Sequence, residues 1–451
     1  MTYHNAVKYI KNALPSSAGE HMSERVEYLC RLIDNPQKKI KYIRLAGTNG
    51  KTISSEMLAS VLSLSGYNVC TLNMSKLDDV RDNIKVNCKQ LDIPQFTHQI
   101  QTVASLCTLM RERVKQAKAE LEASGSLSDA LSDIPLALLE DNASLFPTHS
   151  EILLLAMLCY CKSYKCDVCI IESANTDPDP SLFLPAPFAA VICGAIPSGD
   201  KRQIARIKHY IQRGISEVVS APQDPTAYKT ISDTCAAINC RLSVPVRSAL
   251  SLKQLSLIGS RFVYGNEEYR LSLCGRFQTT NAITAIEALK LLRRSGYNIP
   301  IEAEKNGLMQ VRIPSRFEVL SVSPTIITDS TYQNEAVETV CESLFDFSEI
   351  TGRSLSLCLP KDPDLLRRYL GALEARGYTV DEVFTLCDNE EEIKSLSSVL
   401  SDSQTITACP TVKALSKELI VKRSSYALLL VSGSSRFTSP IRLEIMRHLQ
   451  F

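Results

Sequence analysis

The stretch "IRLAGTNGKTISSEMLASVL", residues 43–62, decides the fold. An apolar run from Ile43 to Ala46 leads into the loop "GTNGKT", residues 47–52, and an amphipathic helical pattern follows. This order of strand, glycine loop and helix brings consecutive backbone N–H groups and a helix N-terminus to one point, where they bind anions. The stretch therefore predicts a site for a nucleotide phosphate.

Two side chains of this loop have phosphate chemistry. Lys51 would reach the β- and γ-phosphates, and the Thr52 hydroxyl is placed to ligate Mg²⁺. The strict P-loop pattern has a further glycine five residues before Gly50, where this chain has Leu45, so the motif is the shorter G-x-x-G-K-T. The alternative to a phosphate site is a tight turn that contains the letters GKT by coincidence.

Length and composition limit the class of protein. The chain has 451 residues, too many for one ordinary core, so we expect two or three domains. With 45% apolar and 22% charged residues it has the composition of a soluble globular protein, and its net charge of +1 gives no electrostatic argument for nucleic acid or membrane. The N-terminus does not look like a signal peptide, and no apolar run reaches the ~18 residues of a membrane span. We expect a cytoplasmic protein.

Sixteen cysteines are scattered along the chain, mostly inside apolar runs. No two CxxC motifs stand at zinc spacing, and the sequence Cys159-Tyr160-Cys161 does not fit such a site either. We therefore expect small buried hydrophobic side chains in a reducing cytosol. Only six histidines are present, which argues against a histidine-rich metal site.

Strand and helix patterns alternate along the first part of the chain. The strand 41–46, the helix 53–66 and the strand 68–75 predict an opening βαβ unit of a parallel sheet. Further predicted elements are a long helix 96–123, an irregular insertion 123–147, a buried helix 149–163, the strands 167–172, 189–196 and 217–221, the helices 201–213 and 279–296, and antiparallel strands within 244–274.

A second α/β pattern begins near residue 300. Apolar runs at 323–329, 354–360, 382–388 and 427–433 alternate with helical stretches at 335–346, 363–377, 390–400 and 411–420. This alternation predicts a smaller doubly wound domain. We therefore predict an α/β protein with a P-loop-type ATP-binding domain of mostly parallel sheet, residues 1–298, and a C-terminal Rossmann-like domain, residues 299–451.

The glycine loop also carries a resemblance to a known family. The segment "AGTNGKT" resembles the nucleotide loop of the Mur ligase superfamily, and "RVEYLCRLIDNPQKKIKYIRLAGTNGK" is similar to folylpolyglutamate synthase and dihydrofolate synthase. Those two enzymes usually have Gly-Ser after the lysine, whereas Thr52 follows it here, as in the peptidoglycan Mur ligases. The resemblance implies an ATP-dependent ligase that phosphorylates a carboxylate to an acyl phosphate, which the amine of an amino acid then attacks.

The resemblance also implies a magnesium site. Ser75, in "MSKLDDVRDNIKVNCKQLD", matches the family's metal-ligating serine, and Glu172, in "CDVCIIESANTDPDP", matches its metal-ligating glutamate. Glu172 ends a predicted strand, at the edge of the sheet where α/β proteins bind ligands, and Mg²⁺ prefers oxygen ligands. The predicted metal ligands are Thr52, Ser75 and Glu172. The alternatives are an ordinary serine and a solvated glutamate at strand ends.

Other matches extend the implied site. Lys208, in "IARIKHYIQRGI", matches a lysine that is often carbamylated and then serves as a metal ligand; the alternative is a surface lysine of an amphipathic helix. Asn281 matches the adenine-contacting asparagine, Arg316 the arginine that reaches the phosphates, and Asp329 a nucleotide-contacting carboxylate. The implied nucleotide-binding residues are Gly47, Thr48, Asn49, Gly50, Lys51, Thr52, Asn281, Arg316 and Asp329, and the implied catalytic residues are Lys51, Arg316 and Lys208.

The sequence departs from the family pattern where the family has histidines. Leu77, Phe277 and Tyr332 stand at three of these places. The Asp-His pair expected after the strand "AAVIC" is missing, and Asp200 or Ser198 are the candidates to replace its metal-binding group. The phosphate-handling residues persist, while the residues near the metal and the second substrate differ.

Three hypotheses follow. The first is a folylpolyglutamate synthase-like ligase that adds L-glutamate to a folate or folate-like acid. The second is a ligase of the same superfamily with another acceptor or amino acid, and the third is a nucleotide-binding pseudoenzyme. For the two ligases the resemblance implies ATP and Mg²⁺, small-molecule partners, a monomer without nucleic acid or membrane, and a hinge near 297–312.

Overall fold

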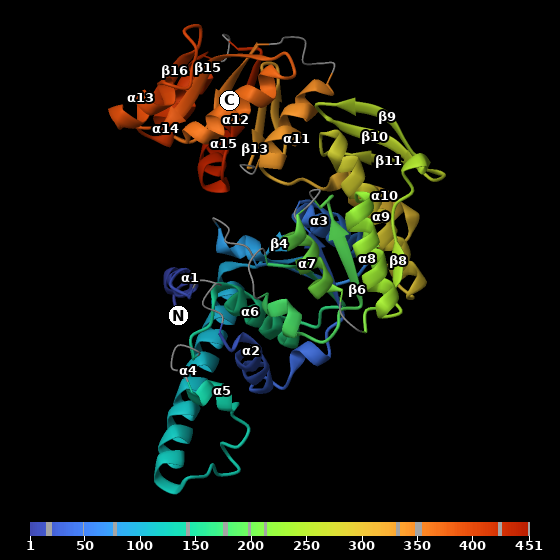
Figure 1. Cartoon of the computed structure of the whole chain (residues 1–451), viewed down its shortest axis with the longest axis vertical. Helices are drawn as coiled ribbons and strands as arrows, with labels where there is room; N and C mark the ends of the chain where they lie inside the picture. The colour runs from blue at the N-terminus through green and yellow to red at the C-terminus, as the bar shows by residue number, and fades with distance from the viewer. Residues whose placement is uncertain are drawn as a thin grey trace. The chain divides into compact units, whose positions relative to one another are not determined.

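The computed structural model describes residues 1–14, 20–47, 49–74, 79–140, 145–174, 179–196, 200–211, 214–330, 334–347, 354–422 and 426–449, with the side chains of 334–336 left out. Within it the chain packs as two compact units (Figure 1). The first consists of Met1–Arg247 with Asn281–Gly307, and the second of Ser248–Thr280 with Leu308–Phe451.

This division differs from the predicted boundary at 298/299 in one main respect. The segment Ser248–Thr280, which the sequence placed in the first domain, packs with the second unit. Its buried residues Leu257 and Cys274 belong to the same hydrophobic core as Ile327 of the second unit, which explains the assignment. The segment predicted as a hinge, 297–312, contains a helix.

The sheet of the first unit has eight strands in the order β4-β3-β2-β5-β1-β6-β7-β8. The six strands from β2 to β8 in that order are parallel, and β3 and β4 continue the sheet antiparallel. Since β1 lies between β5 and β6, the carboxyl ends of these three strands meet at one edge. The strands are β1 Tyr42–Gly47, β2 Val69–Asn73, β3 Ile84–Val86, β4 Lys89–Gln90, β5 Val168–Glu172, β6 Ala189–Cys193, β7 Glu217–Ser220 and β8 Arg241–Ser243.

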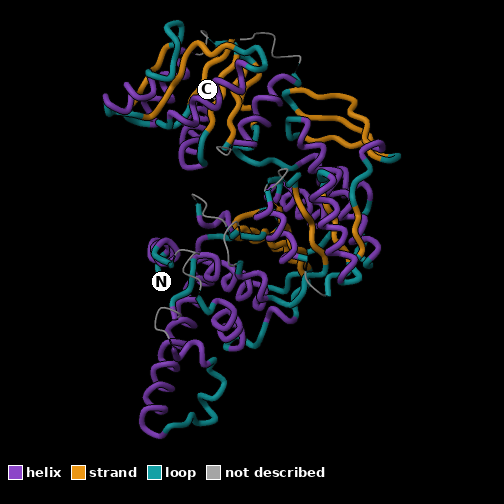
Figure 2. Tube along the Cα trace, viewed as in Figure 1, coloured by secondary structure: helices purple, strands orange, loops and turns teal. Residues whose placement is uncertain are grey.

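Helices lie along this sheet (Figure 2). They are α1 Tyr3–Lys11, α2 Met22–Arg31, α3 Lys51–Leu64, α4 Ile93–Ser124, α5 Leu136–Glu140, α6 His149–Ser163, α7 Lys201–Tyr210, α8 Pro225–Ala237, α9 Arg276–Arg294 and α10 Ile301–Gln310. The long helix α4 begins at the N-cap Asp92 and ends at Gly125, which adopts the left-handed conformation that ends many helices. Its C-terminal half extends away from the sheet together with α5 (Figure 1).

Helix α6 forms the centre of the first unit's core. It is apolar on nearly all sides and almost entirely buried, as the sequence predicted for 149–163. Its N-terminus carries a capping box in which Thr148 and Glu151 satisfy each other's backbone N–H groups. Glu151 also accepts from Arg25 of α2, with Nε 2.7 Å from Oε1, and both side chains are fully buried. This buried ion pair joins α2 to α6.

The second unit contains two sheets. A three-stranded antiparallel sheet, as predicted within 244–274, has the order β11-β10-β9, and a six-stranded sheet has the order β12-β13-β17-β14-β15-β16 with only β12 antiparallel. Their strands are β9 Leu250–Ser256, β10 Gly259–Tyr264, β11 Glu267–Leu271, β12 Glu318–Val322, β13 Thr325–Asp329, β14 Ser354–Cys358, β15 Thr379–Leu386, β16 Thr405–Cys409 and β17 Leu428–Ser432.

Helices cover both faces of the six-stranded sheet, as in a Rossmann-like fold. They are α11 Asn334–Phe345, α12 Pro363–Glu374, α13 Glu390–Ser397, α14 Val412–Val421 and α15 Ser435–Leu449. Adjacent residues of β13 point to opposite faces: Ile327 belongs to the core under α11 and α12, and Ile326 to the core under α14 and α15. Helix α15 was not among the elements expected from the sequence, and it contains Pro440, a residue that normally interrupts helices.

All sixteen cysteines lie in the described part of the chain, and none forms a disulfide. All are buried except Cys88 and Cys166, which are half-buried, so the predicted burial is confirmed for most of them. Across the described ranges, no helix combines the length and the apolar character needed to cross a membrane.

The packing of α10 on α3 gives a first prediction. A Cβ atom on Gly307 would lie 2.6 Å from Cγ2 and 2.7 Å from Cα of Val61. We expect Gly307→Ala to lower the free energy of unfolding by about 1–3 kcal/mol, because the Val61 backbone leaves no room for a methyl group. Denaturant unfolding measures the change.

Gly371→Ala is the matched control, since Gly371 is an exposed glycine of α12 with open space around the added atom. It should raise the free energy of unfolding by up to about 1 kcal/mol, because alanine favours helix. A Gly307→Ala variant as stable as the control would contradict the close approach of α10 to α3.

Candidate nucleotide site

The glycine loop begins where β1 comes closest to β6. Gly47 has a φ of +117°, and a Cβ atom there would lie 2.1 Å from the carbonyl oxygen of Cys193. The backbone therefore accepts only glycine at this position. Thr48, the next predicted phosphate-binding residue, lies outside the described residues.

The turn after β6 packs against the other side of the loop. A Cβ atom on Gly194 would lie 2.8 Å from the carbonyl oxygen of Asn49. Gln223 fixes this turn, because its Nε2 donates to the Gly194 carbonyl at 2.9 Å and its Oε1 accepts from the Ile196 N–H at 2.8 Å. Gln223 was not among the residues expected from the sequence.

Gly50 forms the junction between the loop and α3. It is the N-cap of α3 in the left-handed conformation, with φ +80°, so the chain can turn directly into the helix. An added Cβ atom would lie 2.6 Å from Oδ1 of Asn281, which is 8% exposed on α9. The structure therefore brings the predicted adenine contact Asn281 to the loop, while its contact with adenine stays a prediction.

Lys51 folds back over the loop. Its Nζ donates to the carbonyl oxygen of Gly47 at 2.6 Å, and the side chain is only 6% exposed. Burial lowers the pKa of the Lys51 amine, and the nearby carboxylate of Glu172 partly opposes this effect. A phosphate accepting from this amine would favour its charged form.

Two oxygen atoms meet beside this amine at the carboxyl edge of the sheet. The Thr52 hydroxyl donates to Oε2 of Glu172 at 2.9 Å, and Nδ2 of Asn73 lies 3.4 Å from the same hydroxyl. Asn73 and Glu172 end the neighbouring parallel strands β2 and β5 and are register partners. Sequence reasoning found Glu172 but missed Asn73, although both end a strand at this edge.

The oxygen pair fits a magnesium ion. Adjacent ligands of an octahedral Mg²⁺ ion, each about 2.1 Å from it, lie about 3 Å apart. The 2.9 Å between the Thr52 hydroxyl and the Glu172 carboxylate agrees with that spacing, and both donors are oxygen. Ser75, the third predicted ligand, lies outside the described residues.

The structure does not join Lys208 to this group. Its side chain is exposed in the last turn of α7, so the alternative of a surface lysine is the one that its position favours. Arg206 of the same helix lies nearer: its Nη2 donates to the Ala174 carbonyl at 2.9 Å, and its charge contributes to the lowered pKa of Lys51. Asp200 caps α7 by accepting from the Gln203 N–H at 2.9 Å.

A buried polar network surrounds β1, the strand that leads into the loop. Arg44, in the middle of β1, is fully buried and donates to the carbonyl oxygens of Ser181 at 2.6 Å and Tyr210 at 3.3 Å. Burial raises the pKa of Asp179, whose carboxylate accepts from the N–H groups of Ala174 and Ser181, both at 2.8 Å. This network links β1 to the segment after β5 and to α7, and the apolar surroundings of Arg44 in the sequence concealed it.

The second unit holds Arg316 in a constrained loop. Ser315 and Phe317, on either side of Arg316, both have φ near +51°, a conformation that costs free energy for residues other than glycine. The Phe317 N–H donates to Oδ2 of buried Asp329 at 2.7 Å, and the Ser330 N–H donates to the Ser315 carbonyl at 2.7 Å. Asp329 thus holds the Arg316 loop, and its predicted contact with a nucleotide stays a prediction.

The fold and the loop define a class. The first unit has a mostly parallel sheet with a P-loop-type glycine loop after its central strand, and the second unit is Rossmann-like. These features place the chain among the α/β proteins built on P-loop-type and Rossmann-like domains. The folylpolyglutamate synthase of Thermotoga maritima has this fold, with a TM-score of 0.75 and 19% identity over 99% of this chain and 97% of that chain. A folylpolyglutamate synthase solved with AMPPCP and folate has a TM-score of 0.72 at 18% identity and covers 100% of both chains.

Sequence relatives point the same way. The chain is 23% identical over 439 residues to the dihydrofolate synthase/folylpolyglutamate synthase of Bacillus subtilis, with 93% of each chain covered. It is 22% identical over 468 residues to a "probable bifunctional folylpolyglutamate synthase/dihydropteroate synthase" of Halobacterium salinarum, and it spans 50% of that protein's length. No protein-family model matches. The similarity confirms the predicted resemblance to the folylpolyglutamate and dihydrofolate synthases of the Mur ligase superfamily.

The junction at Gly50 gives a second prediction. We expect Gly50→Ala to weaken ATP binding by at least about tenfold, because the methyl group must displace the Asn281 side chain and the left-handed backbone becomes strained. Isothermal calorimetry with ATP and Mg²⁺ measures the affinity.

Gly66→Ala is the control, since Gly66 follows the other end of α3 with a similar φ of +89° and open space around it. It should lose about 1–2 kcal/mol of stability from backbone strain and bind ATP normally. Equal ATP affinity in the two variants would contradict a role of the Gly50–Asn281 contact in the site.

Proposed function

We propose that this protein is an ATP-dependent ligase that joins a carboxylate to an amine through an acyl phosphate. The observation that carries the proposal is the group at the carboxyl edge of the first sheet, where Lys51 covers the glycine loop and Thr52 meets Glu172. Relatives and solved structures named folylpolyglutamate synthase, similar over nearly the whole chain, support L-glutamate and a folate or folate-like acid as the substrates.

The nucleotide is proposed to be ATP. The N–H groups of the loop and the N-terminus of α3 suit its phosphates, and the Lys51 amine supplies a positive charge. A solved folylpolyglutamate synthase holds AMPPCP, an ATP analogue, which supports this choice. Asn281, beside Gly50, is the proposed adenine contact.

Thr52 and Glu172 would hold Mg²⁺, together with Ser75 as the resemblance implies. When bound, the ion neutralises phosphate charge during transfer. Both of these proposed ligands come from regular elements, the first turn of α3 and the last residue of β5, so their positions are set before any ligand binds. We leave Lys208 out of the proposed shell because its side chain is exposed.

The proposed reaction has two steps. The γ-phosphoryl group moves from ATP to an oxygen of the acid's carboxylate, and ADP leaves. The amine of the amino acid then attacks the acyl carbon, loses a proton and forms the amide while phosphate leaves. Lys51 and Arg316 would stabilise negative charge on the transferred group, and no protein nucleophile is needed because the acyl phosphate is already activated.

The chain differs from the family pattern at residues that the resemblance places near the second substrate. Phe277 stands where the family has a histidine, and its ring packs edge to face on Phe317 with centroids 6.3 Å apart. Tyr332, at another such place, lies outside the described residues. An apolar side chain in the core cannot replace a polar contact with substrate, which favours a different acid or amino acid as the second candidate function. We further propose that the protein is a cytoplasmic monomer and that its substrates are small molecules.

A phosphate-release screen tests the function. With ATP, Mg²⁺ and a matrix of folates and amino acids, phosphate should be released only when both an acid and an amino acid are present. Lys51→Ala should lose at least about 100-fold in turnover, since it removes the cation at the phosphates, and should stay folded. Lys229→Ala, an exposed lysine of α8, is the control and should keep full turnover.

The pattern of the screen separates the three hypotheses. Release with a folate and glutamate supports the first, and release with another pair supports the second. ATP binding without any acid-dependent release would leave only a pseudoenzyme. Full turnover in Lys51→Ala would show that the phosphate loop is wrongly assigned.

The Arg316 loop gives a further prediction. Arg316→Ala should lower turnover by about 100-fold or more, because a cation at the phosphates is lost. Asp329→Ala should also lower turnover, since it releases the Phe317 N–H and with it the conformation of the loop. If Asp329 acts only by holding this loop, the double variant should be no slower than Arg316→Ala alone.

Asp402→Ala, an exposed aspartate of the same unit, is the control and should leave turnover unchanged. A double variant whose losses multiply would show that Asp329 acts independently of Arg316, as in the direct nucleotide contact that the family resemblance implies.

A further inference from the structure

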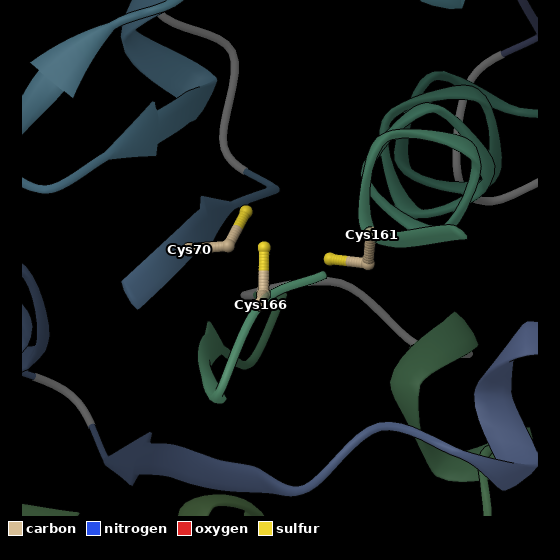
Figure 3. A group of neighbouring side chains, drawn as sticks. All are labelled: Cys70, Cys161 and Cys166. Carbon is tan, nitrogen blue, oxygen red and sulfur yellow. The ribbon is translucent and has the colours of Figure 1, made fainter. Parts of the chain in front are cut away.

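Four cysteines converge in the first unit, away from the glycine loop. The Sγ atoms of Cys70, Cys161 and Cys166 all lie within 4.8 Å of one another, and Figure 3 shows the three side chains pointing toward a common space. The Sγ of Cys169 lies 3.5 Å from that of Cys161. Across the described ranges, this is the one group of three or more potential metal ligands that lie so close together.

Three secondary-structure elements and one loop supply these thiols. Cys70 of β2 and Cys169 of β5 are register partners on adjacent parallel strands, so their side chains leave the sheet on the same face. Cys161 comes from the last turn of α6, which packs in the same core. Cys166 lies in the short connection between α6 and β5.

This connection is fixed by Asn68, which precedes β2. The Asn68 N–H donates to Oδ2 of Asp167 at 2.7 Å, and its Nδ2 donates to the carbonyl oxygen of Lys165 at 3.0 Å. The Asp167 N–H donates to the Asn68 carbonyl at 2.8 Å. Residues on both sides of Cys166 are therefore held in place, which fixes the position of its backbone.

The thiol group is separate from the proposed nucleotide site. Cys70 and Cys169 lie near the first residues of β2 and β5, whereas Asn73 and Glu172 end the same two strands. The parallel strands therefore carry oxygen ligands at one edge and sulfur ligands toward the other. A thiophilic ion would choose the sulfur set, and Mg²⁺ the oxygen set.

We propose that Cys70, Cys161, Cys166 and Cys169 form a tetrathiolate site for Zn²⁺. In a tetrahedral site with Zn–S bonds of about 2.3 Å, the sulfur atoms lie about 3.8 Å apart. The sulfurs of Cys70, Cys161 and Cys166 lie within 4.8 Å of one another, and Cys169, whose sulfur lies 3.5 Å from that of Cys161, would complete the set after a side-chain rotation. Each thiol releases its proton to solvent as its sulfur binds the ion. Cys166, which is half-buried, provides the way in from the surface.

The site would serve to stabilise the fold. It would join α6, the most buried helix of the unit, to β2 and β5, which carry Asn73 and Glu172 at their other ends. Binding free energy at such a site is gained only in the folded chain, so metal removal lowers stability.

Metal binding to the reduced full-length chain tests the proposal. The protein is freed of metal with a chelator under reducing conditions and titrated with Zn²⁺ against a chromophoric chelator, with excess Mg²⁺ present to occupy oxygen sites. We expect one tightly bound Zn²⁺ per chain and a higher melting temperature. Co²⁺ in place of Zn²⁺ should give the sulfur-to-cobalt charge-transfer band and the intense visible bands of a tetrahedral thiolate site.

Cys166→Ser is the first variant, because its half-buried position tolerates a hydroxyl, and Cys70→Ser is the second. Either should weaken Zn²⁺ binding by more than about tenfold, since even outer partners of metal ligands contribute that much. Cys107→Ser, in α4 of the same core and buried, is the matched control and should bind Zn²⁺ like the unmodified chain.

Three results would overturn the proposal. They are the lack of stoichiometric Zn²⁺ binding by the reduced chain, equal affinity in Cys166→Ser and the unmodified chain, and a cobalt spectrum without sulfur bands. A Cys161–Cys169 disulfide that forms in air, detected by mass spectrometry, together with no Zn²⁺ binding after reduction, would identify the cluster as a redox pair instead.

Discussion

The contact between the glycine loop and β6 is the constraint on which the nucleotide site depends. Gly47 lies so close to the Cys193 carbonyl that no side chain fits, and a Cβ atom on Gly194 would also crowd the Asn49 carbonyl. The loop is thereby held against the sheet before any ligand binds. This closeness is possible only because β1 and β6 are parallel neighbours whose carboxyl ends lie together. The positions of Lys51 and Thr52, which follow the loop directly, depend on this contact.

The same contact fixes the charges of the site. Lys51, in the first turn after the loop, is buried where its amine loses solvation, which lowers its pKa. The nearby Glu172 carboxylate partly opposes this effect, and the Gly47 carbonyl accepts a hydrogen bond from the amine. Glu172 in turn accepts from Thr52, which joins β5 to α3. A buried amine beside preformed oxygen ligands is a poor arrangement for stability and a good one for a polyphosphate with a divalent ion. The proposed binding of ATP and Mg²⁺ thus explains why an amine is buried here although its burial costs stability.

In the second unit, the backbone around Arg316 adopts a conformation that costs free energy. Ser315 and Phe317 take left-handed conformations around Arg316, and the buried carboxylate of Asp329 holds them there. A residue presented by a strained loop needs such a brace, because the loop would otherwise relax. Residues that match the family's phosphate contacts therefore occur in both units, whereas Phe277, where the family pattern has a histidine, packs against the apolar core. The family pattern is thus kept at the proposed phosphate contacts and altered at the proposed substrate contacts.

The sequence by itself determined most of the order of the elements, the parallel sheets and the glycine loop, because these depend on hydrophobic period, glycine positions and local capping such as that of α6. It also found Glu172 at the end of a strand. Only the tertiary structure decided that Lys208 faces solvent, that Asn73 joins Thr52, and that Cys70, Cys161 and Cys166 come together with Cys169 beside them. Such contacts join residues distant in sequence, and no local pattern records which strands become neighbours.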